Sequence, residues 1–112
     1  MSDQQIRVET RGSAVIVSPE GDIDMSRSPE FRAALREVND QKPDTLVVNL
    51  DKVGYMDSSG LATLVECMRT AKGNKTEMIL CGMNERVKAI FEIARLDQFF
   101  RIEPTLDDIE GL

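Results

Sequence analysis

The chain has 112 residues, long enough to bury one hydrophobic core, and we expect a single domain over residues 1–112. Apolar residues make up 41%, which excludes a disordered chain, and a net charge of −6 without a basic cluster argues against nucleic-acid binding. Histidine is absent, which excludes Ser-His-Asp and Cys-His catalysis together with histidine metal sites.

No apolar run reaches the roughly 18 residues that a membrane-spanning helix needs. The first five residues are polar and do not resemble a signal peptide, so we expect a cytoplasmic protein without a membrane span. Cys67 and Cys81 have neither the spacing of a metal site nor that of a disulfide framework, and we expect two reduced thiols.

The N-terminal third predicts a β-hairpin followed by a helix. Residues 5–10 alternate between polar and apolar side chains, a tight turn follows, and residues 14–17 form the second strand. Ser28 has the residue type of an N-cap, with Pro29 at the first helical position. An apolar residue every three or four positions then predicts a helix that ends near Asn39 or Asp40.

The remaining two thirds alternate between apolar strands and amphipathic helices. The next predicted elements are a strand at 45–50, a helix at 59–72 that Gly73 caps, and a strand at 77–81. A helix then follows its cap Asn84, and residues 99–102 form a short strand. The last element is a short helix that opens with a Thr105–Asp108 capping box. This order predicts an α/β fold: a mostly parallel sheet of four or five strands, an N-terminal β-hairpin and about four helices.

The junction between the 45–50 strand and the following helix concentrates polar side chains. Asp57, Ser58 and Ser59 lie where the first N–H groups of that helix are unpaired, so they can cap it, and such a helix start also favours anions. Plain capping is therefore one interpretation of this segment.

Three chemical interpretations go further. A serine nucleophile would need Lys52 or Lys88 as its base, and neither has the spacing of a Ser-Lys dyad. A phosphate-accepting aspartate would need Mg²⁺ held by several converging carboxylates, and the first β-α junction supplies only Asp22 and Asp24, which we expect to be solvated. A serine phosphorylated by another protein would change the surface and leave the fold intact.

At these residues the sequence resembles the STAS domains, and most closely the bacterial anti-sigma-factor antagonists. The likeness runs over about residues 5–110. The motifs that carry it are Val47-Val48-Asn49-Leu50, Met56-Asp57-Ser58-Ser59-Gly60-Leu61, the upstream Gly21-Asp22-Ile23-Asp24, and Val87-Lys88-Ala89-Ile90-Phe91 followed by Leu96.

The resemblance implies a partner switch without enzymatic activity or a bound cofactor. In the family, the unmodified antagonist binds an anti-sigma factor that is also an ATP- and Mg²⁺-dependent serine kinase, and a sigma factor is freed. The kinase then phosphorylates the first serine of the motif, which is Ser58 here, and a PP2C-type phosphatase resets the cycle. By the same resemblance, Asp24, Asp57, Ser59 and Gly60 belong to the docking surface.

Two other functions stay open at this point. Some STAS domains are constitutive subunits of lipid-transport ABC assemblies or scaffolds of signalling complexes, and a lysine-assisted serine hydrolase is the enzymatic alternative. Met25, Met56 and Met83 lie beside predicted loops, where flexible thioether side chains suit an adaptable docking face.

Overall fold

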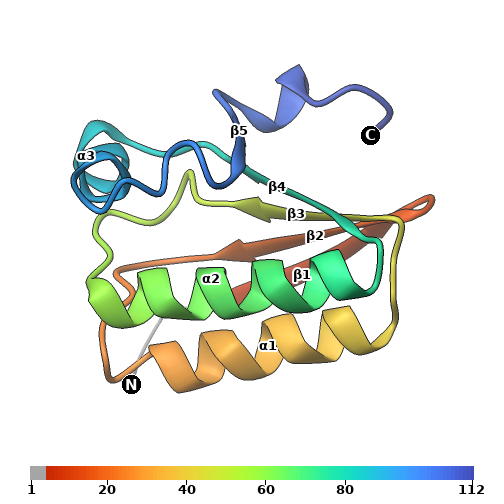
Figure 1. The fold of residues 1–112 in the computed structure, drawn as a ribbon, viewed down its shortest axis with the longest axis horizontal. Helices are drawn as coiled ribbons and strands as arrows, with labels where there is room; N and C mark the ends of the chain where they lie inside the picture. The colour runs from red at the N-terminus through yellow and green to blue at the C-terminus, as the bar shows by residue number, and fades with distance from the viewer. Residues whose placement is uncertain (1–4) are drawn as a thin grey trace.

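A computed structural model describes residues 5–112, in which the helices lie against one face of a five-stranded sheet (Figure 1). The elements in chain order are β1 (Ile6–Arg11), β2 (Ala14–Pro19), α1 (Ser28–Asp40), β3 (Thr45–Asn49), α2 (Ser58–Gly73), β4 (Glu77–Cys81), α3 (Glu85–Ile93), β5 (Arg101–Glu103) and the 3₁₀ turn η1 (Leu106–Asp108). None of the helices in this described part of the chain has the length and apolarity that a bilayer crossing needs.

The strands follow one another in the sheet in the order β1-β2-β3-β4-β5. The β1–β2 hairpin is antiparallel and the other three pairings are parallel, which confirms the predicted α/β class with an N-terminal hairpin. Each parallel pair is joined by one helix, so the carboxyl ends of β2, β3 and β4 meet at one edge of the sheet.

Alternating side chains along the strands divide the core between the two sheet faces. On the helix-covered face, Leu46 and Val48 of β3 are fully buried in the larger apolar cluster. On the opposite face, Val47 of β3 lies in a smaller cluster that Ile109 near the C-terminus closes. The continuous apolar run of the third strand therefore reflects burial on both faces.

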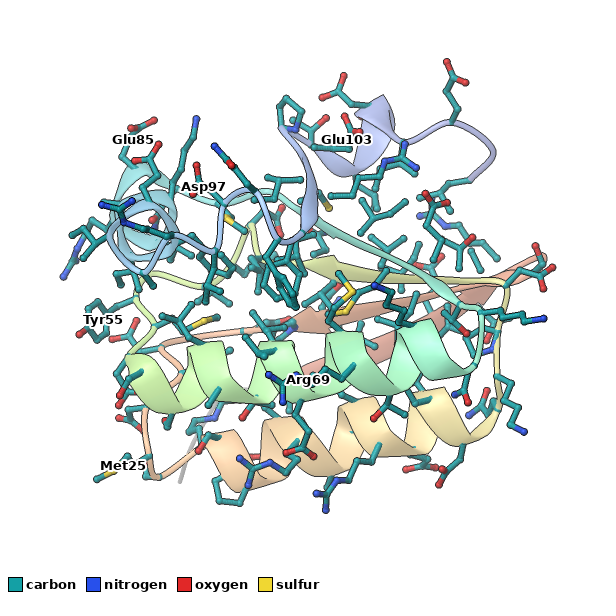
Figure 2. The ribbon with its side chains drawn as sticks, in the orientation of Figure 1. Met25, Tyr55, Arg69, Glu85, Asp97 and Glu103 are labelled. Carbon is teal, nitrogen blue, oxygen red and sulfur yellow. The ribbon has the colours of Figure 1, made fainter. Side chains whose placement is uncertain are left out.

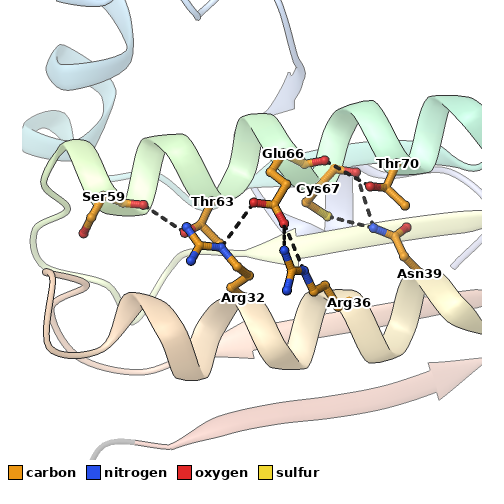
Figure 3. Close-up of polar contacts among 8 residues, drawn as sticks. All are labelled: Arg32, Arg36, Asn39, Ser59, Thr63, Glu66, Cys67 and Thr70. Carbon is orange, nitrogen blue, oxygen red and sulfur yellow. Dashed lines mark hydrogen bonds and ion pairs between the residues drawn. The ribbon is translucent and has the colours of Figure 1, made fainter.

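A row of polar contacts joins α1 to α2 (Figure 3). Glu66 of α2 accepts hydrogen bonds from Arg36 of α1 at 3.0 Å and 2.7 Å, and the Nε of Arg32 lies 3.2 Å from the same carboxylate. Farther along, the buried Asn39 amide donates to the backbone oxygen of Cys67 at 3.4 Å. Because the Arg32, Arg36 and Glu66 side chains are partly or largely exposed to water, their ion pairs add little stability.

The structure corrects two predicted helix ends. Ser28 is not the N-cap of α1 but its first helical residue, because Arg27 and Ser28 both donate backbone N–H bonds to Asp24 O and the turn therefore begins earlier. Gly73 is not the cap of α2: the helix continues through it to the C-cap Asn74, and Lys75 adopts the left-handed conformation with φ 61°.

The C-terminal elements are shorter than predicted. The last strand begins at Arg101 and not at Phe99, because Phe100 is buried edge-on against Phe91 of α3 with ring centroids 5.7 Å apart. The predicted capping box at Thr105 and Asp108 is present, but it opens a single 3₁₀ turn. The described chain thus has three α-helices and this turn where about four helices were expected.

The burial of the two cysteines predicts that their thiols react slowly in the folded protein. Burial raises the pKa of the Cys67 thiol and of the Cys81 thiol to about 11, because a thiolate loses its hydration inside the core. At pH 8 only about one such thiol in a thousand is ionised, and the thiolate is the reactive form. We expect a thiol reagent to label the folded protein slowly and both cysteines rapidly in denaturant, as followed by intact mass. Fast labelling of either cysteine in the folded state would contradict this.

Candidate functional site: the start of helix α2

Two loops from different parts of the chain meet at the carboxyl edge of the sheet. The Ile23 N–H donates to Tyr55 O at 3.0 Å, and the Asp57 N–H donates to Ile23 O at 3.1 Å. This short parallel bridge joins Ile23 to Met56, whose side chains are 1% and 0% exposed. The loop after β2 and the loop before α2 therefore form one continuous surface.

Asp57 is the N-cap of α2 and stabilises the first turn of the helix. Its Oδ1 accepts the backbone N–H of Ser59 at 2.9 Å, the hydroxyl of Ser59 at 2.5 Å and, more weakly, the N–H of Gly60 at 3.3 Å. The hydrogen bond from the Ser59 hydroxyl, together with those two N–H groups, holds the pKa of the Asp57 carboxyl below its ordinary value. The cap is therefore an ionised carboxylate at neutral pH.

Ser58 and Ser59 are neighbours with different environments. The Ser59 hydroxyl is committed to Asp57 and its side chain is partly buried. Ser58 is the first residue of α2 and is exposed, and within residues 5–112 its hydroxyl has no hydrogen-bond partner. Of the two serines, Ser58 is the one that an approaching protein meets.

Gly60 allows α2 to begin close to the bridge. A Cβ atom built there would press against the Cγ of Met56 and would lie 3.1 Å from its sulfur and 3.2 Å from Ile23 Cγ2. Both neighbours are buried and cannot move aside easily. The close approach at Gly60 that the structure shows is thus an internal one, between the helix and the two loops.

Asp24 repeats the arrangement of Asp57 on the neighbouring loop. Its Oδ1 accepts the backbone N–H of Ser26 at 2.9 Å and the Ser26 hydroxyl at 2.6 Å, and these bonds hold the pKa of the Asp24 carboxyl below its ordinary value. The charge of Asp24 is close enough to raise the pKa of Asp57 slightly against the stronger effect of Ser59. The structure therefore brings two ionised carboxylates to the side of Ser58.

Arg27, at the end of the loop between β2 and α1, points into the molecule. The Arg27 guanidinium donates to the backbone oxygens of Glu20 at 2.6 Å and Asp22 at 3.2 Å, and its side chain is only 11% exposed. It stabilises the loop from within and contributes little to the outer surface. Its role was missed in the sequence, although a lone arginine after an acidic loop was a usable signal.

Two large side chains project at this end of the molecule (Figure 2). Met25 is 77% exposed and Tyr55 is 38% exposed, with the Arg86 guanidinium 5.6 Å from the Tyr55 ring centroid. Of the three methionines predicted for a docking face, Met25 is exposed and Met83 is half-buried against the core, so for these two docking stays a prediction. The prediction is wrong for Met56, which is buried under Gly60 because the bridge to Ile23 draws it inward.

The cap of α3 is joined to the same loop. Asn84 Oδ1 accepts the Val87 N–H at 2.8 Å, as predicted for an N-cap. Its amide also donates to the backbone oxygens of Val53 at 3.2 Å and Gly54 at 3.1 Å, a second role that a local sequence pattern does not reveal. Within residues 5–112, no cluster of three or more acidic or sulfur ligands is placed to hold a metal ion.

Comparisons with known proteins agree with this architecture. A family model described as the STAS domain matches residues 5–109. An anti-sigma-B factor antagonist from Listeria monocytogenes is 29% identical over 91 residues, which cover 81% of this chain and 80% of the relative.

Solved structures give the same picture. An anti-sigma factor antagonist from Mycobacterium paratuberculosis superposes with a TM-score of 0.87 and 26% identity, covering 95% of this chain and 90% of that one. The Bacillus cell fate determinant SpoIIAA in its phosphorylated form shares the fold, with a TM-score of 0.71, 20% identity and coverage of 93% and 95%.

The packing at Gly60 generates a stability prediction. Gly60→Ala places a methyl group against buried Met56, and we expect the free energy of unfolding to fall by about 1–3 kcal/mol. Gly73→Ala is the matched control, because a Cβ there meets nothing within 4 Å and its φ is not in the left-handed region. Alanine at this helical site should raise stability by up to about 1 kcal/mol. Equal effects of the two substitutions in urea unfolding would refute the packing argument.

The cap at Asp57 generates a pH prediction. Asp57→Ala removes the acceptor of three hydrogen bonds, and at pH 7 we expect a loss of about 1 kcal/mol of stability. Because the folded-state pKa lies below the unfolded value of about 3.9, the carboxylate stabilises the fold above that pH and loses its effect as the pH falls through the folded-state pKa.

The difference in stability between wild type and Asp57→Ala should therefore shrink in acid, as measured by thermal unfolding between pH 7 and pH 3. Asp97→Ala is the control, since it removes an exposed carboxylate from a turn after α3. A stability gap at Asp57 that stays constant over this pH range would show that an ionised cap is not responsible.

Proposed function

Because the chain belongs to the STAS domain family, we propose that it is an anti-sigma factor antagonist controlled by phosphorylation of Ser58. Unmodified, it binds an anti-sigma factor and frees a sigma factor; phosphorylated, it no longer binds. The names of the Listeria and Mycobacterium relatives support the first half of this proposal. The observation that carries the second half is the contrast between exposed Ser58 and Ser59, whose hydroxyl is bound to Asp57.

A phosphate on Ser58 is compatible with the fold. Ser58 is the first residue of α2, where the helix dipole and the free N–H groups of the first turn favour negative charge. The side chains that anchor this helix, such as Leu61 and Leu64, are buried in the core, whereas the Ser58 side chain is exposed. The modification would therefore add charge to the surface without requiring the helix to unfold.

The same phosphate is incompatible with a docked partner. It adds a charge of about −1.5 to −2 beside the carboxylates of Asp24 and Asp57, which are already ionised. A partner that fits the unmodified surface has to be complementary to those two carboxylates. An additional bulky dianion in the centre of that contact leaves charges desolvated and unpaired, so the complex dissociates.

The residues of the docking surface follow from this geometry. In our proposal Asp24 and Asp57 supply its charge, Ser59 fixes the orientation of Asp57, and Gly60 sets how closely α2 approaches the Ile23–Met56 bridge. This chain itself is not an enzyme and binds no cofactor. The anti-sigma factor would be the serine kinase and would hold ATP and Mg²⁺, a PP2C-type phosphatase would reverse the reaction, and the exchange would take place in the cytoplasm.

The proposal is tested by pairing substitutions at the two serines. Ser58→Ala should bind the anti-sigma factor as tightly as wild type and resist release when ATP is added, whereas Ser58→Asp should bind at least about tenfold more weakly. The measurement is calorimetric titration with the purified partner, with the phosphorylated residue located by fragmentation mass spectrometry.

Ser59→Ala is the matched control, because it removes a hydroxyl from the same turn and leaves Ser58 in place. It should still gain one phosphate, on Ser58. Phosphate found on Ser59 in the wild-type protein, or unchanged release of Ser58→Ala, would overturn the assignment.

A further inference from the structure

The outer edge of β1 carries unused backbone hydrogen-bonding groups. Glu20 N donates to Gln5 O at 2.7 Å, so Gln5 directs its backbone groups toward β2. In an antiparallel strand every second residue directs its backbone groups to the same neighbour, so Arg7 and Glu9 also face β2. The N–H and C=O groups of Ile6, Val8 and Thr10 therefore point outward, away from β2. Within residues 5–112 β1 pairs only with β2 and lies at the end of the sheet, so nothing in the described chain covers this edge.

The side chains of this edge are complementary to a second copy of the same strand. Arg7, Val8 and Glu9 are consecutive, and all three are exposed. When two copies of β1 run antiparallel with Val8 facing its counterpart, each Arg7 lies opposite the Glu9 of the other copy. In that register Val8 pairs with Val8 and Ile6 pairs with Thr10. The outward N–H and C=O groups of one copy therefore face those of the other and can form hydrogen bonds.

The neighbouring registers are unfavourable. An antiparallel pairing centred on Arg7 places two arginines opposite each other, and one centred on Glu9 places two glutamates opposite each other. Like charges directly across a strand pair are destabilising, whereas opposite charges are favourable. The charge pattern of β1 therefore selects the register centred on Val8 over its two nearest alternatives.

Val8 supplies the apolar part of this contact. It lies opposite fully buried Val17 on the helix-covered face of the sheet, yet it is itself 52% exposed. In the Val8-centred register it would be covered by the Val8 of the second copy. Within the chain, Arg7 pairs with half-buried Glu20 at 2.9 Å and Glu9 pairs with Arg11 at 2.8 Å. Arg7, Glu9 and Arg11 are exposed, so these ion pairs are weak and can be exchanged.

From these observations we propose that two copies of the chain associate through β1, in an antiparallel pairing centred on Val8, to form a continuous ten-stranded sheet. The contact involves one strand from each copy and buries less than a standard interface of about 1,600 Å², so the dimer is weak and depends on concentration. Because the pairing reverses the strand direction, the two Ser58 surfaces point away from each other, and the association is independent of the partner switch.

A charge exchange tests the register. In a dimer of Arg7→Glu, a carboxylate at position 7 of each copy faces the Glu9 carboxylate of the other. In a dimer of Glu9→Arg, a guanidinium group at position 9 of each copy faces the Arg7 guanidinium group of the other. Each variant alone should dimerise at least about tenfold more weakly than wild type. An equimolar mixture of the two variants restores opposite charges at both positions and should dimerise again, as measured by sedimentation velocity over a concentration series up to the millimolar range.

Arg69→Glu is the control, because it makes the same charge change on an exposed position of α2 and should leave the dimerisation constant of wild type unchanged. Thermal unfolding of every variant verifies that the fold is intact. A wild type that stays monomeric throughout the series, or a mixture that associates no better than its components, would overturn the proposal. Binding to the anti-sigma factor should be the same for the charge variants and wild type, so failure of the dimer leaves the Ser58 switch untouched.

Discussion

The bridge between Ile23 and Met56 is the contact on which the rest of the site depends. Two backbone hydrogen bonds of 3.0 and 3.1 Å, from Ile23 N to Tyr55 O and from Asp57 N to Ile23 O, join loops that are separated by about thirty residues. The two side chains are fully buried, so the bridge is also part of the core. Without it, Asp24 and Asp57 would belong to unrelated loops, and the start of α2 would not be fixed against the first loop.

Asp57 and Ser59 show how one short segment serves both the fold and a surface. The carboxylate of Asp57 accepts from the Ser59 hydroxyl at 2.5 Å and from two backbone N–H groups, which stabilises the first turn of α2. The same bonds keep it ionised and hold it next to Ser58. Capping and function were separate interpretations of the sequence, but in the structure the cap is what creates the charged surroundings of Ser58.

The sequence predicted the fold well because its strongest signals are periodic. The continuous run from Leu46 to Val48 places its strand correctly because that strand is buried on both sheet faces. The alternation at Ile6 and Val8 also places β1 correctly, although Val8 is 52% exposed. The errors lie where tertiary contacts override local preference. Gly73 is a typical cap, but Lys75 takes the left-handed conformation at the actual helix end.

The site could be predicted only in part, for the same physical reason. Asp57, Ser58 and Ser59 are adjacent in the sequence, so their position at a helix start follows from local patterns. The inward turn of Arg27 and the burial of Met56 depend on backbone oxygens and side chains of distant segments. No local pattern encodes such contacts. From the sequence, Met56 is predicted to lie in a loop, and only the bridge to Ile23 explains why it is buried.

The switch that we propose at Ser58 would work through the surface and not through a change of fold. The start of α2 is held by the Asp57 cap, by the bridge to Ile23 and by the packing of Gly60 on Met56, and none of these contacts uses the Ser58 side chain. Helix starts tolerate added anions, so a phosphate on Ser58 would not require the protein to rearrange. In the proposed switch the energetic penalty would fall on the complex, where the phosphate would face two carboxylates and lose its water. If the scaffold stays rigid, the response to the proposed phosphate would depend on the partner, because only docking of the partner would remove water from the phosphate.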